Sequence, residues 1–102
     1  MLVWPSPSKL DGRPPLSMFY MYVLKLKEGK LYIGYTNNLQ RRVKEHINGE
    51  SKFTKNYRPL KLIYYEAYTS KKDAKKREKT LKQFKGSYGH LKKRIRESIN
   101  EV

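Results

Sequence analysis

The chain has 102 residues, enough for one domain with one modest core. It has no cysteine, which excludes disulfides, thiolate zinc sites and cysteine nucleophiles. Lys and Arg number 24 against 9 Asp and Glu, and the resulting charge of +15 indicates a polyanionic partner, with nucleic acid the first candidate. No apolar run approaches the roughly 20 residues of a membrane span and no signal-peptide core is visible, so we expect a cytoplasmic protein without a membrane partner.

Residues 1–18 contain four of the five prolines and no periodicity, which predicts an irregular tail without chemistry of its own. We expect the folded domain to be residues 19–102. Two other hypotheses concern the tail. In the first hypothesis, Met18 or Met21 is the natural start of the protein. In the second, Trp4 and the prolines dock on the domain or on a partner.

The domain is expected to begin with a hairpin of strands near 19–26 and 31–35, which are rich in aromatic and branched residues. A three-residue loop, Lys27–Gly29, would pair Leu26 with Lys30. The common form of such a loop is a type I turn followed by a left-handed residue, and glycine stands at that third position. We therefore predict a positive φ at Gly29.

This register decides which hairpin side chains share a face of the sheet. Tyr22 would oppose Gly34 and Leu24 would oppose Tyr32, so both tyrosines would project from the same face, with space beside Tyr22. The opposite face is the expected core side and carries Met21, Val23, Leu31 and Ile33.

A helix is predicted near 38–48, from an apolar stripe of Leu39, Val43 and Ile47 that follows capping residues. His46 falls on the inward side of this helix, Arg42 at its margin, and Arg41 almost opposite. Taken alone, His46 is explained as a core histidine and Arg42 as the partner of a nearby glutamate.

The loop at residues 50–59 alternates basic and aromatic side chains. Its basic residues are expected to contact phosphates and its aromatic rings to stack on bases, although Phe53 and Tyr57 could equally anchor the loop on the core. The residues expected to bind nucleic acid are Lys52, Lys55, Tyr57 and Arg58.

A third strand is predicted near 60–68, with Leu62 and Tyr64 on one face and Ile63 and Tyr65 on the other, as in a central strand. Helices are predicted near 70–85 and 88–99, separated by a break at Gly86 to Gly89. The inner stripes are expected to be Ala74, Leu81 and Phe84 in the first helix and Leu91, Ile95 and Ile99 in the second.

The helix near 70–85 has eight basic and two acidic residues between Lys71 and Lys85, and Lys75, Lys76 and Lys79 are expected to bind nucleic acid. Glu78 lies on its inner stripe. An inward carboxylate is costly unless it is paired or binds a cation. Glu78 is therefore either a partner of Lys75 or Lys82, or a metal ligand.

The ordered set of Tyr22, Tyr32, Arg42, His46 and Glu78 resembles the GIY-YIG nuclease family, in its small single-domain branch. The YIG element is intact at residues 32–34, whereas the GIY element is degenerate at residues 20–22 and keeps only its tyrosine. The resemblance implies an α+β fold with a small, mainly antiparallel three-stranded sheet flanked by helices.

The resemblance also implies hydrolysis of phosphodiester bonds in DNA, in repair or other processing, with RNA not excluded as a substrate. Tyr22, Tyr32, Arg42 and His46 would be catalytic, with either Tyr22 or His46 as the base. Glu78 would bind one divalent cation, Mg²⁺ or another such as Mn²⁺. The alternative is a non-catalytic nucleic-acid-binding module on the same fold. The sequence leaves the oligomeric state open.

Overall fold

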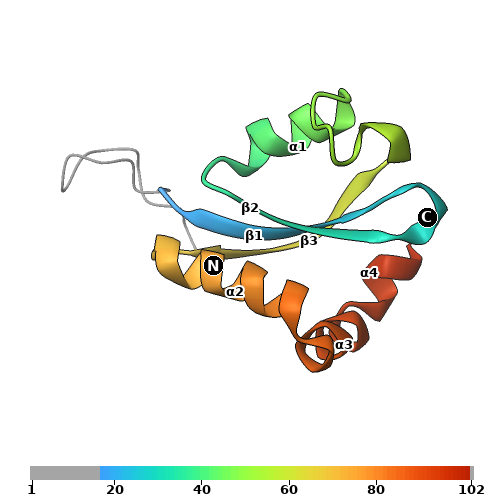
Figure 1. Ribbon diagram of the computed structural model, residues 1–102. Coiled ribbons are helices and arrows are strands. Elements are labelled where there is room, and N and C mark those ends of the chain that lie inside the picture. Colours follow the sequence, from blue (N-terminus) through green and yellow to red (C-terminus); the bar gives the residue numbers. More distant parts are fainter. Residues whose placement is uncertain (1–16, 102) are drawn as a thin grey trace, which may run out of the picture.

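Strand β1 (Phe19–Lys25) lies at the centre of a three-stranded antiparallel sheet, between β2 (Leu31–Thr36) and β3 (Lys61–Tyr68). The computed structural model describes residues 17–101, so nearly all of the expected tail lies outside the described residues. Helix α1 (Leu39–Ile47) covers one face of the sheet, while α2 (Lys71–Gln83), α3 (Lys85–Arg94) and α4 (Arg96–Asn100) cover the other (Figure 1). The predicted fold class is confirmed.

The hairpin has the predicted register. The Leu26 N–H donates to the Lys30 carbonyl at 2.7 Å, and Tyr22 lies opposite Gly34. Gly29 has the expected positive φ of 86°. The predicted type I turn is wrong, because Glu28 also has a positive φ of 70°, which is the type II arrangement.

Each face of the sheet has its own core. Four consecutive residues of β1 are buried, as expected for a strand that is covered on both sides. The core on the side of α2 to α4 contains Met21, Val23, Ile33, Leu81, Leu91 and Ile95. The smaller core on the side of α1 contains Tyr22, Leu24 and Leu26, with Tyr32, Leu39, Leu60 and Leu62 against it.

Strand β3 is an edge strand, which corrects the prediction of a central one. The register shifts between Val23, which pairs with Tyr64, and Leu24, which pairs with Leu62. Ile63 is therefore the extra residue of a β-bulge, and a bulge interrupts the alternation of faces. Ile63 and Tyr64 both pack on the larger core, so the prediction that Leu62 and Tyr64 share a face is wrong.

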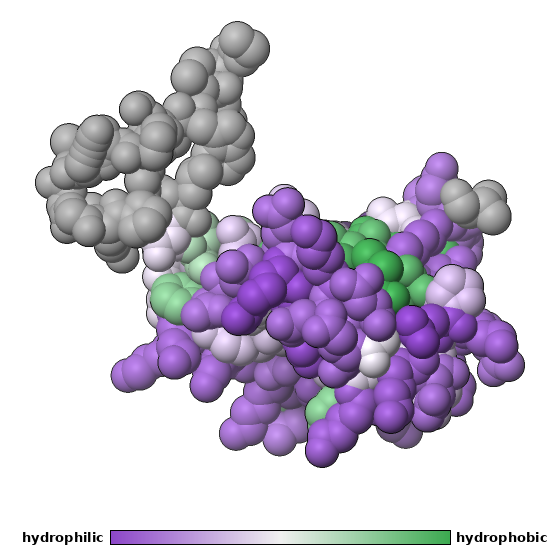
Figure 2. All heavy atoms as spheres, turned by 90° about the horizontal axis from the view of Figure 1, so that it is seen from above, coloured by the Kyte–Doolittle hydropathy of each residue, from purple (hydrophilic) through white to green (hydrophobic). Residues whose placement is uncertain are grey.

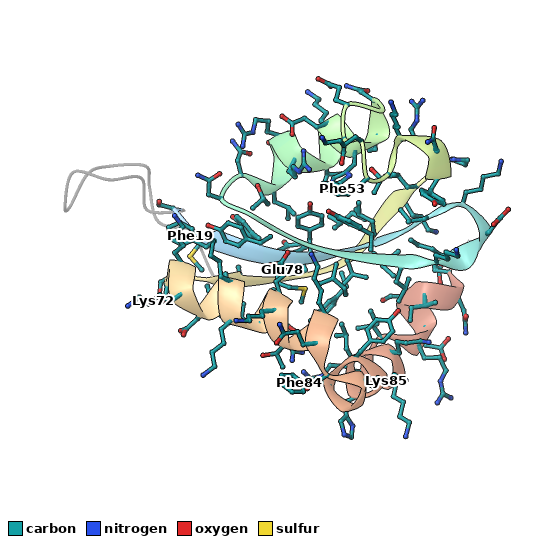
Figure 3. The ribbon with its side chains drawn as sticks, viewed as in Figure 1. Phe19, Phe53, Lys72, Glu78, Phe84 and Lys85 are labelled. Atoms are coloured by element: carbon teal, nitrogen blue, oxygen red, sulfur yellow. The ribbon has the colours of Figure 1, made fainter. Side chains whose placement is uncertain are left out.

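The C-terminal helices differ from the prediction in where the chain breaks. The break falls at Phe84 (φ −117°, ψ 111°), and α3 continues through Gly86 and Gly89. Glycine permits a break but does not require one. The packing of Leu91 on the core outweighs the low helix propensity of the two glycines. Phe84 is 58% exposed instead of facing inward, and Figure 3 shows it pointing away from the sheet.

The surface seen from the α1 side is mostly hydrophilic, with hydrophobic residues showing in separate small areas (Figure 2). A strongly basic chain is expected to have such a surface. Within residues 17–101, no helix combines the length and apolar character needed to cross a bilayer.

Candidate active site

Tyr22, Tyr32 and His46 form a compact aromatic cluster on the face of the sheet that α1 covers. The ring centroids of Tyr22 and Tyr32 are 6.4 Å apart, and that of His46 lies 5.7 Å from Tyr22 and 5.3 Å from Tyr32. The hairpin register puts both tyrosines on this face, and the helix supplies the histidine. The predicted shared face of Tyr22 and Tyr32 is confirmed.

Gly34 makes room for Tyr22. A Cβ at position 34 would lie 2.3 Å from Tyr22 Cζ and 2.4 Å from its hydroxyl oxygen, closer than real Cβ contacts come. The tyrosine is only 1% exposed and cannot move easily into solvent. Glycine at the third YIG position therefore lets the phenol approach β2 closely.

His46 is fully buried, and both of its ring nitrogens have hydrogen-bond partners. Nε2 lies 2.9 Å from the Tyr22 hydroxyl and Nδ1 lies 2.7 Å from Thr54 Oγ1. His46 is the buried residue of α1, whereas Ile47 at the end of the expected apolar stripe is 51% exposed. The helix is thus oriented so that its histidine enters the core.

Burial sets the charge of both groups in the Tyr22–His46 pair. Burial, with a smaller contribution from the Arg42 charge, lowers the pKa of His46 to about 4. Burial raises the pKa of Tyr22 to about 12, although a hydrogen bond from Arg42 acts in the opposite direction. At neutral pH the imidazole and the phenol are therefore both uncharged.

Arg42 approaches the same site from the margin of α1. Its Nη1 is 2.8 Å from Glu45 Oε1 and its Nη2 is 3.4 Å from Ser51 Oγ. The side chain is 28% exposed, against 60% for Arg41, so the predicted difference between the two arginines is confirmed. The ion pair with Glu45 exists, and Arg42 also acts to lower the pKa of the buried Tyr22.

Glu78 points from α2 toward the sheet (Figure 3). Its Oε2 pairs with Lys82 Nζ at 2.9 Å, and its side chain is 24% exposed. Lys82 Nζ also lies 5.7 Å from the ring centroid of Tyr32. The negative charge of Glu78 contributes to the raised pKa of Tyr22, so the carboxylate belongs to the same electrostatic environment as the aromatic cluster.

The donors around Glu78 suit one kind of metal site. Within residues 17–101, no group of three or more His, Cys, Asp and Glu side chains comes together. A single carboxylate with open surroundings fits Mg²⁺, which keeps several waters and takes one or two carboxylates plus phosphate oxygens. It does not fit Zn²⁺, which takes at least three protein ligands.

The basic residues of α2 differ in direction. Lys75 Nζ lies 5.4 Å from the ring centroid of Tyr35 on β2. Lys76 and Lys79 are exposed. At about 100° per residue, Lys79 shares the β2 side of the helix with Lys75, whereas Lys76 points farther from the sheet.

The loop after α1 presents its predicted residues in two ways. Lys52 and Lys55 are exposed, and Tyr57 is 42% exposed beneath Lys30, whose Nζ lies 6.0 Å from the ring centroid. Arg58 instead holds the loop in place. Its Nε donates to the Lys55 carbonyl at 3.1 Å and its Nη1 to the Ile47 carbonyl at 3.5 Å.

Three residues around the site did not appear among the predicted site residues. Thr54 binds His46, Ser51 binds Arg42, and Lys82 connects Glu78 with Tyr32. Thr54 and Ser51 are buried, although they lie in a polar loop. Two hydroxyls in such a loop give no periodic signal. Lys82, in contrast, stands four residues after Glu78 in a helix, and this spacing predicts an ion pair.

The order and placement of these residues agree with a family match. Residues 18–97 match the family described as GIY-YIG catalytic domain. The chain belongs to the GIY-YIG family. The predicted family membership is thus confirmed, and GIY-YIG proteins form a nuclease family.

Several similar proteins carry the name UPF0213. That of Clostridium perfringens is 45% identical over 67 residues, which are 65% of this chain and 72% of that protein. That of Staphylococcus saprophyticus is 42% identical over 66 residues, which are 64% and 80% of the two chains. The solution structure of the UPF0213 protein of Bacillus halodurans is 33% identical, covers 72% of this chain and 81% of its own, and gives a TM-score of 0.49.

Proposed function

We propose that this GIY-YIG protein is a metal-dependent endonuclease that hydrolyses phosphodiester bonds of DNA in repair or other processing. The observation that carries the proposal is that His46 Nε2 lies 2.9 Å from the buried Tyr22 hydroxyl, while Arg42 acts to lower the pKa of the same phenol. A core histidine and a surface arginine would each be ordinary alone. Two such groups around one buried tyrosine, with the negative charge of Glu78 also acting on its pKa, are chemically specific.

Arg42 is suited to bind the phosphate that is cleaved. A guanidinium has five N–H donors in a rigid fork, and the contacts with Glu45 and Ser51 fix its plane while leaving other donors for an anion. Charge on the phosphate oxygens is stabilised by such a group without a change in its own protonation.

Glu78 would hold the divalent cation, with Lys82 giving up or sharing the carboxylate. A bound Mg²⁺ or Mn²⁺ would supply Lewis-acid stabilisation of the phosphate and the leaving oxygen. Exposed residues of the loop after α1 and of α2 would position the strand: Lys52, Lys55, Tyr57, Lys75, Lys76 and Lys79. Arg58 would contribute through the shape of the loop, because its guanidinium is bonded to backbone carbonyls.

Tyr22 is the proposed general base. As a phenolate it would take the proton of the attacking water, while the P–O bond to the leaving oxygen breaks. Its pKa of about 12 means that the phenol must first lose its proton, which the nearby Arg42 charge favours. Tyr32 and His46 would position the water and the phosphate.

A non-catalytic nucleic-acid-binding module is the second candidate. Its supporting observation is that two charged residues of the site already have partners, Arg42 with Glu45 and Glu78 with Lys82. Ion pairs of this kind are sufficient for a fold that uses its basic surface only to bind phosphates.

The test is cleavage of a panel of duplex, flap, branched and single-stranded DNA, with matched RNAs, in the presence of Mg²⁺. Wild-type protein is compared with Arg42→Ala and with Arg41→Ala, a matched control one residue away on the exposed side of α1. We expect the wild type and Arg41→Ala to cut at least one DNA and Arg42→Ala to be inactive. Binding without cleavage by all three proteins would support the binding module instead.

A further inference from the structure

We propose that Lys82 neutralises Glu78 when no metal is bound, and that a divalent cation must displace it from the carboxylate. Lys82 then sets the metal concentration at which the site fills. The competition for the carboxylate stands on the contacts of this chain, while its consequence for cleavage rests on the proposed nuclease function.

Lys82 contacts two groups of the candidate site. Its Nζ lies 2.9 Å from Glu78 Oε2 and 5.7 Å from the ring centroid of Tyr32. Lys75 also lies within reach of Glu78 along the helix, but its Nζ is directed to the ring of Tyr35, 5.4 Å from the centroid. Lys82 is therefore the ammonium group that pairs with the inward carboxylate.

This ion pair is of a kind that exchanges easily. The side chain of Lys82 is 47% exposed and that of Glu78 is 24% exposed, so water and salt screen their attraction. Holding a long lysine side chain in one geometry also costs rotamer entropy, which offsets part of the attraction. A divalent cation carries twice the charge of the ammonium group, and this difference favours it at the same carboxylate.

We do not expect Lys82 and a divalent cation to share Glu78. Their like charges would lie close together on one carboxylate, and the double charge of the cation doubles the repulsion. Lys82 can leave Oε2, because its side chain is half exposed and the face of the Tyr32 ring also attracts an ammonium group. Beside Tyr32 the released ammonium can bind a phosphate oxygen of the substrate.

The alternative is that the pair only stabilises α2, as pairs four residues apart on a helix do. In that case the removal of Lys82 would change the stability of the helix, and cation binding would change only through the loss of one positive charge from the chain. The two cases therefore differ in metal affinity, which can be measured without any nuclease substrate.

The direct test is Mn²⁺ binding to the full chain at low salt, measured from the electron paramagnetic resonance signal of the free ion. Lys82→Met keeps most of the side-chain length without the charge, and we expect it to bind Mn²⁺ about fivefold more tightly than the wild type. Lys72→Met removes the same charge from the first turn of α2, away from Glu78 (Figure 3), and should change the affinity less than about twofold. Equal affinity of Lys82→Met and wild type, or equal gains in both variants, would overturn the inference.

A background without the carboxylate shows whether Lys82 acts through Glu78. In Glu78→Gln, the further change Lys82→Met should leave the remaining Mn²⁺ affinity unchanged, because the ion pair no longer exists there. A fivefold gain in this background as well would show that Lys82 acts on the cation elsewhere, against the inference. So would a lack of Mn²⁺ binding by both the wild type and Lys82→Met.

Cleavage then tests the consequence for the reaction. In Mg²⁺ titrations of single-turnover cleavage, the midpoint for Lys82→Met should lie at about fivefold lower Mg²⁺ than for the wild type, whatever the maximal rate. An unchanged midpoint would contradict the role of Lys82 although the protein cuts DNA. If no protein cuts any substrate, the proposed function fails, and Mn²⁺ binding still decides the competition for Glu78.

Discussion

Two clusters of identical composition occur in this protein, and they differ in what is left unpaired. Each has two tyrosines, one arginine and one glutamate. The first, which we call the open cluster, consists of Tyr22, Tyr32, Arg42 and Glu78. The second, the closed cluster, consists of Tyr64, Tyr68, Arg77 and Glu66.

In the closed cluster the carboxylate is saturated. Glu66 Oε1 accepts from Tyr68 and from Arg77 Nε, and Oε2 accepts from Tyr64 and from Arg77 Nη2. Burial raises the pKa of Glu66, but the hydrogen bonds from Arg77, Tyr68 and Tyr64 outweigh it and the pKa is lowered. This arrangement ties β3 to α2, and each carboxylate oxygen of Glu66 accepts two hydrogen bonds.

In the open cluster the carboxylate of Glu78 and the guanidinium of Arg42 are each only partly paired. Glu78 has Lys82 on Oε2, and Arg42 has Glu45 and Ser51 on two of its nitrogens. Residue types alone therefore do not distinguish the closed cluster from the open one. The number of hydrogen-bond positions that the fold leaves free does.

The largest expected effect is on cleavage by Arg42→Ala. Loss of a cation that stabilises the phosphate should lower kcat at least about a hundredfold, with little change in stability. The measurement is single-turnover cleavage of the best substrate of the panel. Arg77→Ala, assayed where it is folded, is the control from the closed cluster, and an equal loss of kcat in both variants would remove the functional distinction.

Arg77→Ala should instead affect stability. It leaves Glu66 partly buried and without its cation, which should cost about 3 kcal/mol of unfolding free energy in urea titrations. We expect Arg42→Ala to cost less than about 1 kcal/mol, because Glu45 is more exposed than Glu66. A reversed order would mean that the open cluster supports the fold.

The histidine should make stability depend on pH. The unfolded chain binds a proton at His46 below pH 6.5, whereas the folded chain resists it until about pH 4, so acid favours unfolding in this window. Between pH 6.5 and 4.5 the wild type should lose about 2 kcal/mol, and His46→Gln should lose clearly less. Parallel pH profiles of the two proteins would show that His46 does not titrate as described.

The smallest expected effect separates two neighbouring lysines. Lys75→Gln should weaken DNA binding and lower the salt slope by about 1, because Lys75 lies on the β2 side of α2. Lys76→Gln should change both quantities less, since its side chain points farther from the sheet. Fluorescence anisotropy at several salt concentrations gives both values, and equal effects would mean that DNA contacts α2 from its outer side.

Local chemistry was enough to predict the hairpin. The turn length and the position of Gly29 determine the register, and the register determines the face of Tyr22 and Tyr32. The direction of His46 and Arg42 followed from helical periodicity in the same way. Glu78 came from the resemblance to the family, because no local pattern in the sequence predicts that it lies near Tyr22.

Tertiary features were not predictable in this way. The bulge at Ile63 and the edge position of β3 depend on how β3 pairs with β1, which its own alternation does not specify. The break at Phe84 depends on α3 packing on the core. The hydrogen bond between Thr54 and His46 joins a loop residue to α1, and the sequence does not reveal this contact.

Glu78 provides the most direct test of the claim that the open cluster is a catalytic centre. Single-turnover cleavage by Glu78→Gln is measured across a Mg²⁺ titration, together with DNA affinity. We predict that cleavage is lost at every Mg²⁺ concentration while DNA affinity changes little, because the carboxylate serves the metal and not the fold. Cleavage at the wild-type rate across the titration would show that Glu78 is merely the ion-pair partner of Lys82 and would contradict the account.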